Sequence, residues 1–192
     1  LEAGKDFGRY KDVDGDGIPW RTLPGTHPSK GAFFTRGTTR DAYARYSERG
    51  PDYLYNMERL LRKFRTAAEL VPPPVLRKAS RPTRFGVIFF GSTSASMHEA
   101  LDVLEAEGVF LDALRLRAFP FADAVREFIA AHEKVFVVEQ NRDGQMHTLL
   151  VNELTLDPAR LVRVLHFDGT PITARFIAGA IRKNMVWKKE FA

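Results

Sequence analysis

The stretch DVDGDGIPW (12–20) carries carboxylates at alternate positions, namely Asp12, Asp14 and Asp16. Carboxylates in this spacing, followed by a glycine such as Gly17, begin an EF-hand loop, in which oxygen ligands surround a calcium ion. The bidentate glutamate that this loop needs at its twelfth position is replaced by Leu23, and Pro19 occupies the usually aliphatic eighth position. We therefore interpret the run as a polar turn rich in Asp and Gly, and expect no metal there.

A second group of polar residues follows the apolar run KVFVVE (134–139): Glu139, Asn141, Arg142, Asp143 and Gln145. In open α/β sheets, ligands favour the carboxyl ends of the strands, and the helix N-terminus expected next favours anions. The alternative is structural: Asn141 or Asp143 caps that helix, and Glu139 pairs with an arginine.

Other catalytic signatures are missing from the sequence. The chain has no cysteine, which excludes disulfides, thiolate metal sites and an iron–sulfur cluster held by this chain alone. No Gly-x-Ser-x-Gly, phosphate-loop or His-Glu-x-x-His pattern is present, and GSTS (91–94) is better interpreted as a helix cap. His98 and His132 lie in predicted helices, where we expect surface or capping roles.

Composition indicates one ordinary domain with an appendage. The chain has 192 residues and a net charge of +5, which suits nucleic acid, a phosphorylated ligand or an acidic partner. No Lys/Arg run exceeds two residues, so a solvated arginine-rich surface is the preferred interpretation. The longest apolar runs are too short to span a bilayer, and no signal peptide is visible, which favours a cytoplasmic location. Because the first residue is Leu1 and not Met, we expect a fragment or a processed chain.

The first 71 residues divide into a loop and a helix. Residues 1–50 show no sustained periodicity but contain several aromatic residues, which suggests an extended segment that lies on another protein surface. Pro51 suits the first position of a helix over 51–71, and Pro72–Pro74 then stop it. A 3-4-3-4-3 spacing makes one apolar stripe on this helix: Leu54, Met57, Leu61, Phe64, Ala68 and Val71.

From residue 75 onward the pattern changes to alternating strands and helices. The expected strands are 85–91, 114–119, 134–139 and 161–167, and the expected helices are 94–108, 121–132, 144–154 and 173–185, with Thr173 as the last N-cap. Short apolar strands separated by helices predict βαβ units and a mainly parallel sheet covered on both faces.

Several long strings, in order along nearly the whole chain, resemble one family. They are DVDGDGIPWRTLPGTHP (12–28), FFTRGT (33–38), NMERLLRKFRTAAELVPPPV (56–75), LRLRAFPF (114–121), VFVVEQNRDGQM (135–146) and LHFDGTPITARFI (165–177). Together they look like the C-terminal part of the alpha subunit of 2-oxoglutarate:ferredoxin oxidoreductase, and more broadly of the 2-oxoacid:ferredoxin oxidoreductases.

The resemblance implies a fold and a domain plan. The region 74–192 is similar to the transketolase C-terminal domain, a three-layer α/β/α sandwich with a mostly parallel five-stranded sheet. By that analogy PVLRK (74–78) is a first, antiparallel strand. The plan is an extended N-terminal segment (1–50) that packs on a partner domain, one long connecting amphipathic helix (51–73) and the α/β domain (74–192).

The resemblance also implies a function for the parent enzyme. It oxidatively decarboxylates a 2-oxoacid with coenzyme A, giving an acyl-CoA, carbon dioxide and reduced ferredoxin. Thiamine diphosphate, magnesium and an iron–sulfur cluster belong mostly to the beta subunit, so we expect no cofactor on this chain and no catalysis by it alone. The implied partners are a preceding pyrimidine-binding domain of the same subunit, the beta subunit and ferredoxin, without nucleic acid or membrane.

The residues that could reach the substrate or coenzyme A approach, or an interface, are His27, Arg36, Arg40, Glu139, Asn141, Arg142 and Gln145. A structural hydrogen bond or a surface charge is the simpler role for each of the first three. The family pattern Gly-Thr-x-His-Asp-Glu reads GTTRDAY (37–43) here, with Arg40 and Ala42 in place of the His and Glu. This departure puts in doubt any role that needs those two groups, and the exact substrate.

A competing hypothesis is a free-standing α/β module that binds a phosphorylated ligand or nucleic acid. It predicts one exposed basic face made by seven residues: Arg59, Arg62, Lys63, Arg65, Arg115, Arg117 and Arg142. Interleaved acidic residues would count against it.

Overall fold

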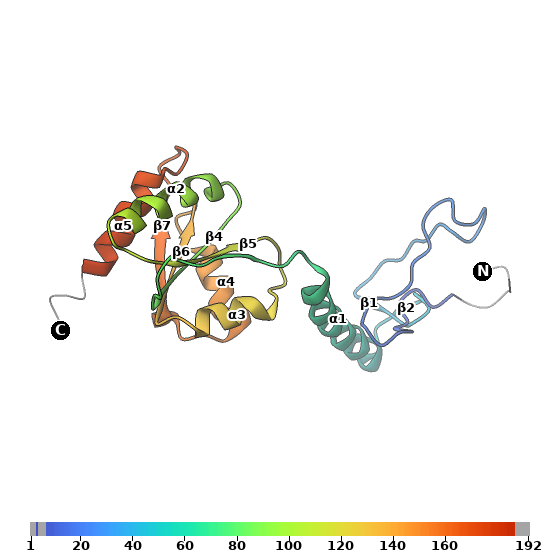
Figure 1. Ribbon diagram of the computed structural model, residues 1–192. Helices are drawn as coiled ribbons and strands as arrows, with labels where there is room; N and C mark the ends of the chain where they lie inside the picture. The colour runs from blue at the N-terminus through green and yellow to red at the C-terminus, as the bar shows by residue number, and fades with distance from the viewer. Residues whose placement is uncertain (1–2, 4–6, 187–192) are drawn as a thin grey trace. The chain divides into compact units, whose positions relative to one another are not determined.

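The computed structural model describes residue 3 and residues 7–186. The chain divides into two compact units, Leu1–Val71 and Pro72–Ala192, and each is described by itself (Figure 1). Among the described residues, no helix combines the length and the apolar composition needed to cross a membrane.

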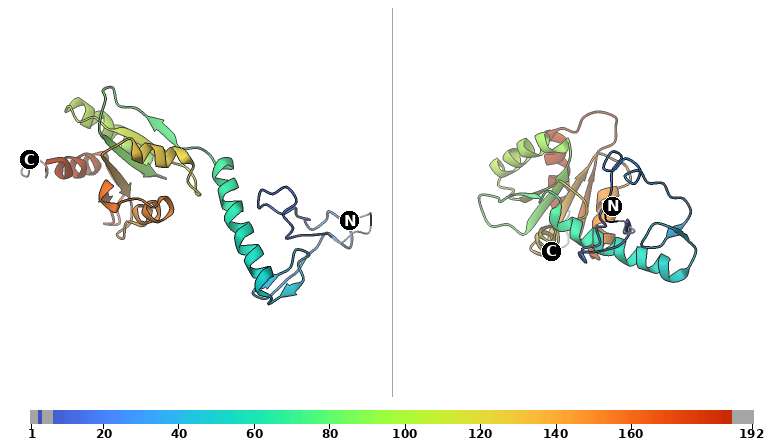
Figure 2. Two further views of the ribbon diagram at one scale, coloured as in Figure 1. Left: turned by 90° about the horizontal axis from the view of Figure 1, so that it is seen from below. Right: turned by 90° about the vertical axis from the view of Figure 1, so that its right-hand side faces the viewer.

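The first unit consists of a long loop, a small hairpin and one helix. Strands β1 (Thr39–Arg40) and β2 (Tyr46–Ser47) pair antiparallel, and helix α1 spans Gly50–Leu70. Pro51 lies in the first turn of α1, where its missing N–H costs no hydrogen bond. The helix ends before the prolines at 72–74, as the sequence predicts. The loop runs along one side of α1 (Figure 2).

The face of α1 that this loop covers is polar. Asn56 and Arg59 are the buried residues of the helix, each only 5% exposed. The predicted apolar stripe is instead open to solvent, with Leu54 58%, Leu61 62% and Phe64 51% exposed. Periodicity therefore identifies the apolar face correctly, but this face does not pack against the loop of its own unit.

The second unit is built on a five-stranded sheet in the order β3-β5-β4-β6-β7. The strands are β3 (Val75–Arg77), β4 (Phe85–Phe90), β5 (Asp112–Leu116), β6 (Lys134–Glu139) and β7 (Leu161–Leu165). β3 pairs antiparallel with β5, and the other three pairings are parallel. The expected mostly parallel sheet with an antiparallel first strand is confirmed.

Helices cover both faces of this sheet and make the three layers (Figure 1). The helices are α2 (Thr93–Ala106), α3 (Asp123–Ala130), α4 (Gln145–Leu154) and α5 (Ala174–Val186), with a short 3-10 turn at Pro158–Arg160. Alternate residues of β4 point to opposite layers. Val87 and Phe89 pack in the cluster that holds residues of α2 and α5, while Ile88 packs with residues of α3 and α4. Each face of the sheet therefore packs against its helices through its own apolar core.

Two local predictions differ in detail from the structure, and a third is confirmed. Helix α3 ends at Ala130, so His132 lies beyond it and is buried, not at the surface. The expected capping role is confirmed, because its Nδ1 bonds the Phe128 carbonyl in the last turn of α3 (2.6 Å). Its Nε2 bonds the Asp112 carboxylate (3.2 Å). Ser92 occupies the N-cap position of α2, but its side chain makes no capping hydrogen bond. The cap at Thr173 is confirmed by the bond from the Phe176 amide to its hydroxyl (3.2 Å).

Candidate functional site

The polar residues predicted at the end of β6 form a hydrogen-bonded network. Glu139 is completely buried and accepts from the backbone amides of Met146 (2.8 Å) and His147 (3.1 Å). It also accepts from the side-chain amide of Asn141 (2.7 Å). The network thus places a carboxylate at the N-terminus of α4, where the helix dipole and the free amides stabilise negative charge.

Asn141 completes this helix start from the other side. Its side-chain oxygen accepts from the backbone amides of Asp143, Gly144 and Gln145, at 3.2, 2.8 and 3.2 Å. Glu139 has no arginine partner in the described part of the chain, so the expected ion pair is wrong. The physical reason is that the unpaired amides of α4 supply the positive potential that an arginine would otherwise give.

A hollow of about 450 Å³ lies next to this network. Asn141 and Gln145 line it, together with Ser92 and Thr93 at the start of α2. Gln140 closes one side by donating to both hydroxyls at 3.1 Å. The hollow therefore offers hydrogen-bonding groups from the ends of β4 and β6. Its lining contains no titratable residue, which leaves it without an acid, a base or an ionic anchor.

The other three predicted strand-end residues, Glu139, Arg142 and Asp143, do not line this hollow. Arg142 is exposed and pairs with the adjacent Asp143 (2.8 Å), a surface contact that contributes little. The carboxylate of Glu139 already accepts hydrogen bonds from the first amides of α4. The structure therefore brings Asn141 and Gln145 together in one concavity and gives Glu139 and Arg142 other contacts.

His147 is a buried histidine beside this network that sequence reasoning did not identify. It is 5% exposed, and its Nδ1 has no hydrogen-bond partner in the described part of the chain. Burial lowers the pKa of its imidazole, and the nearby positive charge of Arg163 lowers it further, against the opposing effect of Glu139. The ring is therefore held in its neutral form.

The three predicted residues of the N-terminal segment have different roles. His27 accepts from the backbone amides of Ser29 (3.2 Å) and Lys30 (3.0 Å) through Nδ1, which fixes a local turn. Arg36 is exposed. Arg40 donates to the carbonyl of Gly37 (3.0 Å) and lies over the ring of Tyr10, with 5.3 Å between its guanidinium carbon and the ring centroid. Of the three, Arg40 lines the pocket described next.

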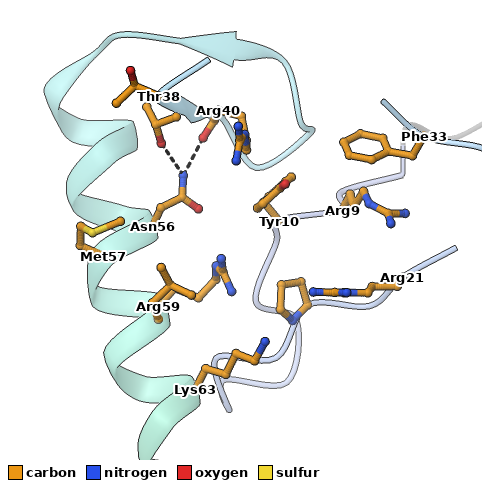
Figure 3. Close-up of a pocket in the computed structure, with 13 residues that line it drawn as sticks. Arg9, Tyr10, Arg21, Phe33, Thr38, Arg40, Asn56, Met57, Arg59 and Lys63 are labelled. Atoms are coloured by element: carbon orange, nitrogen blue, oxygen red, sulfur yellow. Dashed lines mark hydrogen bonds between the residues drawn. The ribbon is translucent and has the colours of Figure 1, made fainter. Parts of the chain in front are cut away.

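That pocket lies between α1 and the loop and has a volume of about 340 Å³ (Figure 3). Five cationic side chains line it: Arg9, Arg21, Arg40, Arg59 and Lys63. Arg59 and Lys63 are one turn apart on α1, but the other three come from separate parts of the loop. Only the i, i+4 pair was visible in the sequence, so the pocket could not be predicted from spacing.

The three aspartates of the calcium-like run bond within the first unit. Asp12 accepts from the amide of Gly17 (3.0 Å) and pairs with Arg62 of α1. Asp14 accepts from the indole of Trp20 (2.6 Å), and Asp16 from the amide of Ile18 (2.7 Å). These contacts are those of a polar turn docked on α1.

Arg62 and Arg59 also bear on the competing nucleic-acid hypothesis. Arg62 is paired with Asp12 and Arg59 is buried, so the four cations predicted on α1 do not form one exposed basic face. Within the described residues, no group of three or more His, Cys, Asp or Glu side chains could hold a metal ion.

Comparison with known proteins gives one clear relative. The chain is 30% identical over 183 residues to "2-oxoacid:ferredoxin oxidoreductase 2, subunit alpha" of Aeropyrum pernix, covering 93% of this chain and 27% of that protein. The chain therefore spans about a quarter of the length of the relative it matches. No protein-family model matches the chain.

A solved structure gives the corresponding match in three dimensions. It is the 2-oxoglutarate:ferredoxin oxidoreductase of Magnetococcus marinus, solved with 2-oxoglutarate, coenzyme A and succinyl-CoA bound. The TM-score is 0.80 at 19% identity, covering 96% of this chain and 32% of that one. This likeness shows a shared fold. With the sequence match, it confirms the resemblance found in the motifs.

Proposed function

We propose that this chain is the C-terminal part of the alpha subunit of a 2-oxoacid:ferredoxin oxidoreductase, and that its own role is structural. The observation that carries the proposal is the match to one such alpha subunit over 93% of this chain. The parent complex would convert a 2-oxoacid and coenzyme A to an acyl-CoA, carbon dioxide and reduced ferredoxin. The substrate we propose is 2-oxoglutarate.

The exposed face of α1 supports an assembly role. Leu54 and Leu61, with neighbouring apolar residues, leave a stripe of one helix open to water. A stripe of this kind on a 21-residue helix is typical of a surface that another protein domain covers. The partners we propose for the chain are a preceding pyrimidine-binding domain of the same subunit and a beta subunit, with ferredoxin as electron acceptor.

The residues of this chain do not supply the ligands of an iron–sulfur cluster, one of the cofactors that the family uses. An iron–sulfur cluster is held by cysteine thiolates, and the chain has no cysteine. Among the described residues, no group of three or more His, Cys, Asp or Glu side chains could hold a metal ion by itself. We therefore propose that those cofactors bind elsewhere in the complex, and we assign no catalytic step to this chain.

Arg40 and Ala42 replace the His and Glu expected from the family pattern. The guanidinium of Arg40 is held by the Gly37 carbonyl and the Tyr10 ring, so it is fixed within its own unit. We propose His27, Arg36 and Arg40 as the residues of this segment nearest to an incoming substrate or coenzyme A. The hollow at Asn141 and Gln145 is proposed as a contact surface for a neighbouring domain.

The first experiment is to sequence the DNA on both sides of the coding region. We expect an in-frame upstream segment that encodes a thiamine-enzyme pyrimidine domain, and a neighbouring gene for a cysteine-containing beta subunit. The complete complex should then reduce a viologen dye only when 2-oxoglutarate and coenzyme A are both present. A start codon immediately before the Leu1 codon, with no thiamine enzyme nearby, would refute the proposal.

The assembly role has its own test in the complete complex. The change Leu61→Glu places a charge in the exposed apolar stripe and should prevent stable copurification of the complete alpha subunit with the beta subunit. The control is Glu58→Gln, which changes an exposed residue of the same helix outside the stripe. Normal assembly of the Leu61→Glu complex would show that the stripe is not an interface.

A further inference from the structure

The pocket between α1 and the loop of the first unit is unusual in its charge. Five cationic side chains line it, and in the part of the chain that the structure describes no Asp or Glu does so. We propose that this pocket binds an anion of the phosphate class, with the charge and size of a diphosphate group. The proposal does not depend on the assembly role of the chain.

The guanidinium groups of the pocket are stabilised by aromatic rings and carbonyls. Arg9 lies 4.2 Å over the ring of Phe33, while Arg40 and Arg59 lie 5.3 and 5.8 Å from the centroid of Tyr10. Arg59 donates to the carbonyl of Gly17 (3.0 Å). Cation–π contacts and hydrogen bonds to carbonyl oxygens hold the guanidinium groups in position without neutralising their charge.

Two of these groups still have unused donors. The Nε atoms of Arg40 and Arg59 are buried and have no hydrogen-bond partner in the described structure. Arg59 is 5% exposed, so water does not replace the missing acceptor easily. Buried polar groups are nearly always hydrogen-bonded, and an unpaired one marks a place where a ligand or ion can supply the partner.

Additional charge comes from Arg21 and Lys63. Neither forms an ion pair or hydrogen bond with its side chain in the part of the chain that the structure describes. Figure 3 shows Lys63 on α1 and Arg21 on the loop, with Arg59 and Tyr10 between these residues and Arg40. Both carry charge into the same pocket, so an anion bound there would meet cations from the loop and from the helix.

The class of anion follows from the number and type of donors. Guanidinium forks bind the oxygens of phosphates and carboxylates in pairs. A dicarboxylate would neutralise only two of the five cations, whereas the higher charge of a diphosphate neutralises more of them. The side-chain oxygen of Asn56 is a buried acceptor without a partner in the described structure, and it faces Tyr10 (Figure 3). A protonated phosphate oxygen, or a hydroxyl of a phosphate ester, can donate to it.

The test is calorimetric titration of the full chain with inorganic diphosphate and with ADP, at constant ionic strength, using 2-oxoglutarate and sulfate as comparison anions. We expect diphosphate and ADP to bind at least about tenfold more tightly than either comparison anion, because several charge-assisted bonds are added. Equal affinities for the two probes would indicate a site for the phosphates alone. Tighter binding of ADP would indicate that the nucleoside is also contacted.

Matched variants locate the binding. Lys63→Gln and Arg21→Gln should each weaken diphosphate binding about tenfold, the effect of losing one charged hydrogen bond. Arg65→Gln removes an exposed charge from the same helix outside the pocket. It should change the affinity for diphosphate by less than about twofold. Equal weakening by Arg65→Gln would overturn the proposal, because it would show a general charge effect.

A measurement on the unmodified chain guards against variants that do not fold. Diphosphate should slow amide hydrogen exchange in peptides that cover residues 9–21 and 56–63, and leave the α/β unit unchanged. No heat of binding and no protection with either phosphate probe would overturn the proposal, as would equal binding of 2-oxoglutarate. None of these results would alter the assembly test.

Discussion

The buried carboxylate of Glu139 accepts a hydrogen bond from the backbone amide of His147 at 3.1 Å, across the turn between β6 and α4. Together with the bond from Met146, it satisfies two amides that a helix start leaves unpaired. Glu139 therefore joins the last residue of a central strand to the first turn of the next helix.

Glu139→Ala should destabilise the α/β unit by about 3 kcal/mol, because two backbone amides and the Asn141 side chain lose a charged acceptor. Urea unfolding followed by circular dichroism measures the change. The control is Glu153→Gln, at an exposed position of the same helix, which should change the free energy of unfolding by less than about 0.5 kcal/mol. If the two variants unfold alike, the Glu139 network does not hold the helix start.

The pH dependence of stability should carry a contribution from His147. Burial and Arg163 lower its pKa in the folded state, so the unfolded chain binds a proton more readily. The contribution is fully present above the unfolded pKa, near 6.5, and is lost as the pH falls from there to the folded pKa. Its slope cannot exceed about 1.4 kcal/mol per pH unit.

Urea unfolding between pH 5 and pH 8 tests this prediction. The change His147→Gln should flatten the profile below about pH 6.5, because Gln does not titrate. His98→Gln, at an exposed position of α2, should leave the slope as it is. A profile for His147→Gln that keeps the original slope would contradict the prediction.

Gly17→Ala should loosen the loop from α1. A Cβ at Gly17 would lie 2.4 Å from the backbone nitrogen of Lys63, and the residue has a φ of +81°. Gly15, at a φ of +77°, has nothing within 4 Å of an added Cβ, so Gly15→Ala carries the backbone strain alone. We expect about 1 kcal/mol of destabilisation for Gly15→Ala and at least about 2 kcal/mol more for Gly17→Ala.

The measurement is the rate of limited proteolysis within residues 1–50, which reports opening of the loop. It should rise far more for Gly17→Ala than for Gly15→Ala. Equal rates would mean that the loop does not pack closely on the helix at this point.

Asn56→Asp should detach the hairpin from α1. The Asn56 amide group donates to the hydroxyl of Thr39 (3.1 Å) and to the carbonyls of Arg40 (2.7 Å) and Asp52 (3.1 Å). A carboxylate there would face two carbonyl oxygens, which should cost about 2 to 3 kcal/mol. Hydrogen exchange of the α1 amides measures the loss, with the exposed Asn152→Asp as the control. Unchanged exchange for Asn56→Asp would show that other contacts hold the hairpin.

The fold of the second unit could be predicted because its signals are local. Apolar runs such as 85–90 are buried on both faces, and this requires a central strand with helices on both sides. The antiparallel direction of β3 came from the resemblance, since three residues carry no directional pattern. The prediction that Glu139 pairs with an arginine was wrong. The sequence shows which side chains carry charge, but it does not show that backbone amides at the start of a helix will surround this carboxylate.

The first unit was less predictable, for a physical reason. Periodicity shows that α1 has an apolar face, but only the folded chain shows that the opposite face is the buried one. The cationic pocket joins residues from Arg9 to Lys63, across a loop without regular structure. The conformation of such a loop is set by specific long-range contacts, such as Asp12 to Arg62, and these leave no periodic trace in the sequence.

Strand β3 has a consequence for solubility. It is an edge strand of three residues, and it exposes the side chains of Val75 and Leu76. An open edge of this kind can pair with another chain and start aggregation. The prolines at 72–74 supply no N–H just before it, and its short length leaves few groups to pair. The sheet is thereby protected from growing by strand addition at this edge.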